Sequence, residues 1–266
     1  MFVQKPTALE KIEFSFSEKI NGVIWKTIAD PSKKRLYLEC RNAASKVVTF
    51  AALDLEKKAW LWKDMALDES WWISLSACGA DVLFLSVYNN TNNPERTSLV
   101  AFDVIVKKVI WWKNNFTLEA IYDRALIGLD NVTGLKRSLA ISDGVELSTD
   151  AFIGEQQNLS ITRPFQYHEG TPHFETVRAF LEIKCNFSAV AILEYAEFGS
   201  FSIMSAFTGV ADLANYLIVC NEEGDVLIKE ALGERLKGIA HDTFFIFSGY
   251  LIFVKNKSEL IVYKFL

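Results

Sequence analysis

The sequence "AALDLEKKAWLWKD" at residues 51–64 decides the fold, because the chain repeats it as "VAFDVIVKKVIWWKN" at residues 100–114. In both copies an apolar run ends in an aspartate, a polar turn follows, and a tryptophan lies eight residues after the aspartate. The copies are offset by 49 residues and carry the pairs Asp54–Trp62 and Asp103–Trp111. Aspartate bonds readily to nearby backbone N–H groups, so we interpret both aspartates as turn caps.

The repeat extends upstream of this motif. A shift of 47 residues places Trp25 on Trp72 and the apolar residues 36–38 on residues 83–85. Each copy then contains four short strand-like runs, at 23–29, 35–41, 47–55 and 59–63, and at 70–77, 81–88, 98–105 and 108–113. Four strands in about 50 residues is the size of one β-propeller blade.

The strand composition favours sheets that are buried on both faces. Residues 81–88 and 216–220 are nearly continuous apolar runs rather than alternating ones. The neighbours Trp71 and Trp72 would point to opposite faces of one strand, and both would need cover. We therefore interpret the tryptophans of the repeat as core packing between blades, with an aromatic platform for a ligand as the alternative; they are Trp25, Trp62, Trp72 and Trp111.

The rest of the chain repeats less clearly. Residues 119–148 predict a third blade with "SDG" as its last turn, although the apolar spacing there also fits a helix. Residues 150–185 and 186–233 are assigned to two further blades, the second ending in a hairpin with "EEGD" as its turn. Three strands follow at the C-terminus.

A three-stranded last blade needs a fourth strand. The N-terminal strand at residues 11–17 can supply it by pairing with the C-terminal blade, which would close the ring and remove two sheet edges. The sequence therefore predicts an all-β protein, a six-bladed propeller, with five blades or an irregular ring as alternatives. No Gly-, Ser- or Pro-rich linker divides the chain, so residues 1–266 are expected to form a single domain.

The repeated motif resembles the strand–turn–strand unit of PQQ-type quinoprotein propeller repeats. Asp54, Asp103, Trp62 and Trp111 match the Asp and Trp of that unit, while the glycine of its turn is missing in both copies. The chain also resembles an uncharacterised bacterial family of propeller-like proteins, which implies no known activity. The quinoprotein dehydrogenases that the motif resembles are secreted or periplasmic enzymes, and many carry a pair of adjacent cysteines. This chain shows no secretory signal and no adjacent cysteines. We therefore expect no PQQ and no other cofactor.

Composition excludes several classes of partner. The formal charge of −5 and the absence of a sustained Lys/Arg run argue against nucleic acid. The sequence contains no run of about 18 apolar residues, so we expect no membrane span. Residues 1–19 are charged and lack a continuous apolar region, so we expect no signal peptide there. The four cysteines are scattered without a CxxC pair. We expect a cytoplasmic monomer that binds neither nucleic acid nor membrane.

The most unusual local chemistry is "QYHEGTPHFE" at residues 166–175, which holds two of the three histidines. His168, Glu169, His173 and Glu175 could converge around a turn on a divalent metal, with His173 and Glu175 on one strand face. The favoured interpretation is a polar hairpin with surface side chains. Ligand candidates at this place are His168, Glu169, His173, Glu175 and Arg163.

Two further features stand out. Glu39 and Arg41 share a face of an otherwise apolar strand, which predicts a buried ion pair, with a ligand-facing pair as the alternative. The polar insert "YNNTNNPERTS" at residues 88–98 is either a recognition loop or a loop without function.

No GxSxG, Walker-type loop, GxGxxG or HExxH motif is present. The sequence therefore favours a non-catalytic binding or scaffolding protein whose partner is another protein. The alternatives are an enzyme or a binder of a small ligand or sugar, with a site at the mouth of the central channel, and a structural subunit of a larger assembly. Exposed tryptophans would support a partner surface, and fully buried ones would not.

Overall fold

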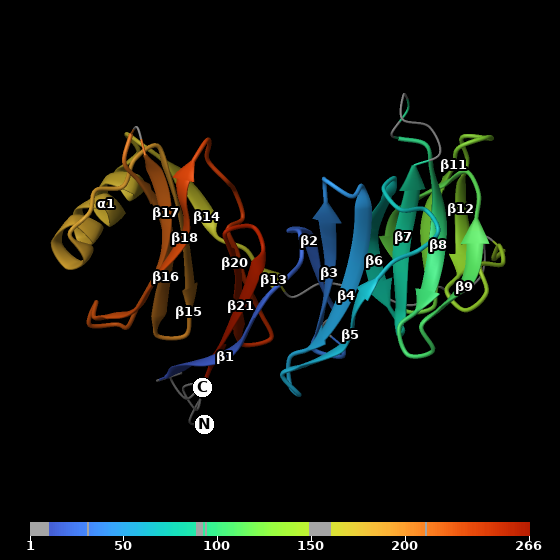
Figure 1. Cartoon of the computed structure of the whole chain (residues 1–266), viewed down its shortest axis with the longest axis horizontal. Coiled ribbons are helices and arrows are strands. Elements are labelled where there is room, and N and C mark those ends of the chain that lie inside the picture. The colour runs from blue at the N-terminus through green and yellow to red at the C-terminus, as the bar shows by residue number, and fades with distance from the viewer. Residues whose placement is uncertain (1–10, 31, 89–92, 94, 149–160, 211) are drawn as a thin grey trace, which may run out of the picture. The chain divides into compact units, whose positions relative to one another are not determined.

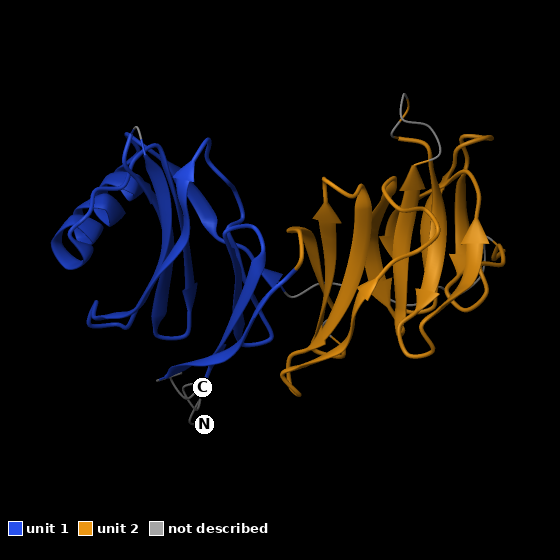
Figure 2. Cartoon of the chain, in the orientation of Figure 1, with its two compact units in different colours: residues 1–20, 160–266 blue, residues 21–159 orange. Residues whose placement is uncertain are grey.

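The computed structural model describes residues 11–266 except 31, 89–92, 94, 149–160 and 211 (Figure 1). The described residues form twenty-one strands and one helix, which confirms the all-β class. The contacts within the chain define two compact units, one made of residues 21–159 and one of residues 1–20 with 160–266 (Figure 2). The single domain over residues 1–266 stays a prediction.

The unit of residues 21–159 contains three antiparallel sheets. Sheet I consists of β2 (Val23–Asp30), β3 (Arg35–Asn42), β4 (Val47–Asp54) and β5 (Ala59–Met65). Sheet II consists of β6 (Ile73–Gly79), β7 (Val82–Tyr88), β8 (Thr97–Asp103) and β9 (Lys108–Lys113). Sheet III consists of β10 (Phe116–Ile121), β11 (Ala125–Asp130) and β12 (Lys136–Ala140). The two repeat copies are thus two successive four-stranded meanders, as the sequence predicts.

The aspartates of the repeat lie at the β4–β5 and β8–β9 turns. Asp54 Oδ1 accepts a hydrogen bond from Lys57 N at 2.9 Å. Asp103 Oδ1 accepts from Ile105 N at 2.8 Å and from Val106 N at 2.7 Å. These bonds satisfy backbone donors that the tight turn leaves outside the strand ladder.

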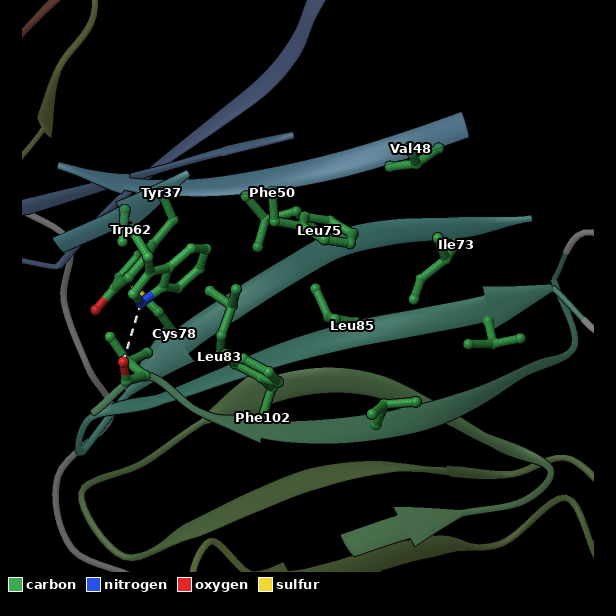
Figure 3. Packing of buried hydrophobic residues seen from close by; sticks show 14 residues of the cluster. Tyr37, Val48, Phe50, Trp62, Ile73, Leu75, Cys78, Leu83, Leu85 and Phe102 are labelled. Atoms are coloured by element: carbon green, nitrogen blue, oxygen red, sulfur yellow. Dashed lines mark hydrogen bonds between the residues drawn. The ribbon is translucent and has the colours of Figure 1, made fainter. Parts of the chain in front are cut away.

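Two tryptophans of the repeat join each sheet to the next. Trp62 packs edge-on against Phe102 and donates from Nε1 to the carbonyl of Val104 at 2.9 Å (Figure 3). Trp111 donates in the same way to the carbonyl of Ile141 in the turn that follows β12, at 2.8 Å. Figure 3 shows the core between sheets I and II, where apolar side chains of both sheets interdigitate, among them Tyr37, Phe50, Leu75, Leu83 and Leu85.

The other two tryptophans of the repeat are not core residues, which corrects the interpretation of Trp25 and Trp72. Their side chains are 65% and 48% exposed. Trp25 lies at a break in the β2–β3 register between Ile24 and Lys26, and such a bulge re-aims the extra residue. Trp72 lies just before β6, which begins at Ile73, and is therefore outside the strand.

Sheet III confirms the strand interpretation of the third blade. β10 and β11 pair from Phe116↔Asp130 to Ile121↔Leu126, so the helical spacing there was misleading. The "SDG" hairpin forms, with Ala140 N bonded to the carbonyl of Val145 at 2.9 Å. Gly144 is required in this turn because its φ is +70° and a Cβ would lie 2.8 Å from the Trp111 ring.

The second unit contains two five-stranded sheets. Sheet IV consists of β14 (Phe165–His168), β15 (Ile192–Phe198), β16 (Phe201–Thr208), β17 (Leu213–Cys220) and β18 (Val226–Leu236). Sheet V consists of β13 (Ile161–Thr162), β19 (Phe244–Phe247), β20 (Tyr250–Lys255), β21 (Glu259–Phe265) and β1 (Ile12–Lys19). β1 pairs antiparallel with β21, which confirms that the N-terminal strand completes the C-terminal sheet. The "EEGD" hairpin also forms, between β17 and β18.

The prediction that residues 150–185 form a blade is wrong. Its described residues form β13 and β14, which join sheets V and IV, and helix α1 (Pro172–Cys185). Proline favours the first turn of a helix, and Phe174, Leu181 and Cys185 are the buried residues of the face that packs on sheet IV. The described residues thus contain five sheets, and the six-blade count stays a prediction.

None of the described helices is long and apolar enough to cross a membrane.

Candidate functional site

One end of sheets I and II carries a surface of aromatic and cationic side chains, which we name the tryptophan–arginine cluster. It consists of Trp25, Arg41, Lys46, Trp71 and Trp72. The antiparallel order places the start of β2, the end of β3 and the β3–β4 turn at the same end of sheet I. A hydrogen bond from Val48 N to the carbonyl of Ser70 at 2.6 Å brings the segment before β6 to this end.

The guanidinium of Arg41 lies between two indoles. Its carbon is 5.4 Å from the ring centroid of Trp25 and 5.3 Å from that of Trp71. Its N–H groups donate to Glu39 Oε1 at 2.6 Å and to the carbonyls of Trp71 at 3.4 Å and Ile73 at 2.9 Å. Planar stacking and a fork of donors are properties of arginine that lysine lacks. Arg41 thus links Trp25 of β2, in sheet I, to the segment that precedes β6 of sheet II.

Glu39 is fully buried and forms the anionic half of this arrangement. Besides Arg41, its carboxylate accepts hydrogen bonds from Ser74 Oγ at 2.8 Å and Leu75 N at 2.7 Å. The structure therefore brings Glu39 and Arg41 together as a buried ion pair that links sheets I and II. Because it is buried and hydrogen-bonded to three donors, this carboxylate is poorly placed to reach a substrate proton.

The surface of the cluster is cationic and apolar. The ammonium of Lys46 lies 4.8 Å from the Trp71 ring centroid. Burial lowers the pKa of the Lys26 ammonium, and nearby Glu39 opposes this effect. Trp25 and Trp72 leave much of their rings open to solvent. Such a surface can bind apolar or anionic groups, because indole faces and cations offer both kinds of contact.

The histidine segment has a different geometry from the one expected. His168 ends β14, and His173 is the second residue of α1, so His173 and Glu175 do not share a strand face. The Glu169 carboxylate accepts from Ala191 N at 2.7 Å, and that of Glu175 accepts from Gly170 N at 3.2 Å. Both glutamates thus stabilise the turn before the helix.

The remaining candidates are separate from one another. The rings of His173 and Tyr167 lie 5.1 Å apart, and Arg163 forms an exposed ion pair with Asp242 at 3.0 Å. Within the described part of the chain, no group of three or more His, Cys, Asp or Glu side chains is placed to hold a metal ion. Most of the tip of the insert at 88–98 lies outside the described residues.

Two features of the surface were missed from the sequence. The contacts of Arg41 with Trp25 and Trp71 depend on the bulge in β2. No local sequence pattern predicts this bulge. The exposed apolar side chains of the β8–β9 hairpin were also missed. A position-by-position comparison of the two repeat copies could have found them, because charged residues of the first copy are apolar in the second.

Comparison with protein families gives one match. Residues 29–111 match the model of the Domain of unknown function (DUF4905). The match covers most of sheets I and II, including Glu39, Arg41 and Trp71. No match was found among curated proteins.

Three solved structures resemble the chain weakly. A member of the DUF4221 family from Bacteroides vulgatus is 9% identical, with a TM-score of 0.37, over 98% of this chain and 97% of that chain. BamB from Moraxella catarrhalis is 10% identical, with a TM-score of 0.24, over 90% and 84%. Raptor from Chaetomium thermophilum is 7% identical, with a TM-score of 0.35, and the match spans 96% of this chain but 28% of Raptor.

Proposed function

We propose that the chain is a non-catalytic binding or scaffolding protein that uses the tryptophan–arginine cluster to bind another protein. The observation that carries this proposal is the exposure of Trp25 and Trp72, at 65% and 48%, together with the contact of the Trp25 ring with the Arg41 guanidinium. Tryptophan and arginine are enriched among the residues that dominate protein–protein binding energy. Large aromatic rings left open next to a rigid ion pair are typical of a preorganised contact surface.

The chemistry of the cluster supports binding rather than catalysis. The Glu69 carboxylate accepts hydrogen bonds from Trp71 N and Trp72 N, and the cations of the cluster lie against indole rings. The other carboxylate, that of Glu39, is buried and hydrogen-bonded to three donors. A catalytic acid or base must reach a substrate proton, which this carboxylate cannot do. The expected partner presents flat apolar groups beside carboxylates, which complement the open Trp25 ring and Lys46.

The same proposal covers the finer points of architecture and setting. We infer a β-propeller of six blades built from PQQ-like repeats, and a cytoplasmic monomer in the absence of its partner. The stacked four-stranded meanders of sheets I and II support the propeller, because each is one repeat copy and matches the size of a blade. The exposed tryptophans also favour the related alternative of a subunit in a stable assembly.

The test is a capture experiment with surface variants. Tagged wild-type protein and a Trp25→Ala, Trp72→Ala variant are returned to the native cytoplasm, and recovered proteins are quantified by mass spectrometry. The matched control is Phe165→Ala in the other unit, whose ring is 72% exposed. We expect a partner that the wild type and the control recover and that the double variant loses at least tenfold, consistent with about 1.4 kcal/mol per factor of ten.

The folded state is checked by far-UV circular dichroism, because the two exposed rings contribute little to the core. Equal recovery by all three proteins would show that the cluster is not the binding surface. Co-elution of the wild type with its partner through gel filtration would separate the stable-assembly alternative from transient binding.

A further inference from the structure

The β8–β9 hairpin exposes more apolar surface than its place in the sheet explains. Five large apolar side chains within eight residues are 41–61% exposed, namely Ile105, Val106, Val109, Ile110 and Trp112. Scattered apolar residues are normal on protein surfaces, but a contiguous group of this kind marks an interaction site. The hairpin lies within the unit of residues 21–159 and shares no residue with the tryptophan–arginine cluster.

The β4–β5 hairpin of the first repeat copy is an internal control for this one. Lys58 and Lys107 occupy the same left-handed turn position, with φ of 53° and 61°. The register breaks at the same step, between Ala52 and Leu53 in one copy and between Ala101 and Phe102 in the other. The first copy has one further register break, between Phe50 and Ala52, which the second copy lacks. The two hairpins therefore share the turn conformation and the bulge next to it.

The two hairpins differ in their surface residues. At the offset of 49, Glu56 becomes Ile105, Lys57 becomes Val106 and Lys63 becomes Trp112. Because the first copy builds the same turn with charged residues, the fold does not require the apolar ones. Val109 and Ile110 correspond to Trp60 and Leu61, which are apolar as well. The comparison therefore singles out Ile105, Val106 and Trp112 as side chains that serve something outside the unit's own core.

The hairpin also ends in an open sheet edge. β9 is the last strand of sheet II and pairs only with β8 among the described strands. Cross-strand partners share a face, so the pairing places Val109 with Phe102 and Trp112 with Val100, on the face that packs on sheet I. An edge strand with apolar side chains along it can accept a further strand through main-chain hydrogen bonds.

The charge of the hairpin selects the partner. Three lysines flank the apolar residues, namely Lys107, Lys108 and Lys113. None of them forms an ion pair with another described residue. Asp103, the acid at the turn, is engaged by backbone N–H groups. Antiparallel pairing with a second copy would bring these lysines together, which disfavours self-association.

We propose that the edge of β9 is a docking site for an extended segment of a partner protein in which apolar and acidic residues alternate. The segment adds a strand to sheet II through the main chain of β9. Its apolar side chains cover Val109 and Trp112, and its carboxylates pair with Lys108 and Lys113. A lipid surface fits less well, because the apolar residues run along the strand instead of gathering at the turn alone.

The test uses a fluorescein-labelled synthetic peptide of alternating valine and glutamate and full-length protein. Fluorescence anisotropy measures binding, and hydrogen exchange with mass spectrometry measures protection of the β9 amides. The main variant carries the first-copy residues, Ile105→Glu, Val106→Lys and Trp112→Lys. The matched control is Val132→Lys with Leu135→Glu, which removes exposed apolar residues from the β11–β12 turn of the same unit.

We expect the wild type and the control to bind the peptide and the main variant to lose at least tenfold in affinity. Bound peptide should slow exchange of the β9 amides, and a valine–lysine peptide should bind at least tenfold more weakly. No binding by the wild type, equal binding by all variants, or binding without protection of β9 overturns the proposal. Vesicles of phosphatidylcholine and phosphatidylserine that bind the wild type in place of the peptide overturn it in favour of a lipid surface.

Discussion

Replacing Arg41 by methionine tests how sheets I and II are held together and how the tryptophan–arginine cluster is built. Methionine keeps much of the side-chain volume but has no charge and no N–H donor. Glu39 would then stay in the interior with two neutral donors, Ser74 Oγ and Leu75 N. The stacking of the guanidinium on Trp25 and Trp71 would be lost at the same time.

The magnitude follows from these contacts. Removing one partner of a buried ion pair costs about 3–5 kcal/mol, and each partly exposed cation–π contact contributes about 0.5–1 kcal/mol. The Arg41 side chain is 16% exposed, so water screens part of this loss. We expect Arg41→Met to lower the free energy of unfolding by about 4 kcal/mol, a large part of the roughly 5–15 kcal/mol typical of a domain.

The assay is urea unfolding followed by tryptophan fluorescence. All seven tryptophans lie between residues 25 and 112, so fluorescence reports on the unit of residues 21–159. Arg137→Met is the matched control, because Arg137 pairs with Glu146 in the same unit and the two side chains are 34% and 46% exposed. An exposed pair contributes about 0.2–1 kcal/mol, so this control should shift the midpoint little.

A double-mutant cycle isolates the ion pair. Glu39→Gln alone removes the charge that Arg41 balances, and the double variant Glu39→Gln, Arg41→Met should be less destabilised than the sum of the two single variants. The expected coupling is about 2 kcal/mol. A coupling below about 0.5 kcal/mol, or an Arg41→Met effect no larger than that of Arg137→Met, would refute the role assigned to the pair.

Three further outcomes are expected. Gly144→Ala should cost about 2 kcal/mol in urea unfolding, because the left-handed φ and the Trp111 ring both oppose a Cβ; an unchanged midpoint would contradict this. Burial raises the pKa of the Cys40 thiol to about 12 and that of Cys220 to about 11, so DTNB should react slowly at pH 8, faster towards pH 11, and with all four thiols in urea; rapid reaction of the native protein would contradict it. Glu194→Gln should cost about 2–3 kcal/mol by circular dichroism, because the buried carboxylate accepts two backbone N–H groups and two side-chain donors; no change would contradict it.

The regular part of the fold could be predicted because the chain repeats itself. Two copies of one pattern fix strand order, turn positions and spacing together, so the strands of sheets I and II fall close to the expected ranges. The pairing of β1 with β21 followed from an unsatisfied sheet edge. These inferences depend on backbone periodicity, which each residue type carries locally.

The prediction failed where tertiary context decides. Helix α1 was missed because residues 150–185 were assigned to a blade from the repeat size, although Phe174, Leu181 and Cys185 have helical spacing. The exposure of Trp25 depends on a bulge, and a one-residue slip moves a side chain to another face without any change in composition. Residues 89–92 and 94 of the insert at 88–98 lie outside the described residues, so its two interpretations stay open.

A comparison of the two repeat copies shows which residues the sheet requires and which residues only the tryptophan–arginine cluster requires. Ser86 pairs with Leu99 in sheet II as Glu39 pairs with Phe50 in sheet I, so these two residues occupy equivalent positions. Sheet II builds the same ladder with serine there, and the buried glutamate is therefore no requirement of the fold. A buried ion pair is seldom the most stable solution for a core position. Its presence in sheet I is explained by the cluster, because the carboxylate is what holds Arg41 in place between two indoles at the surface.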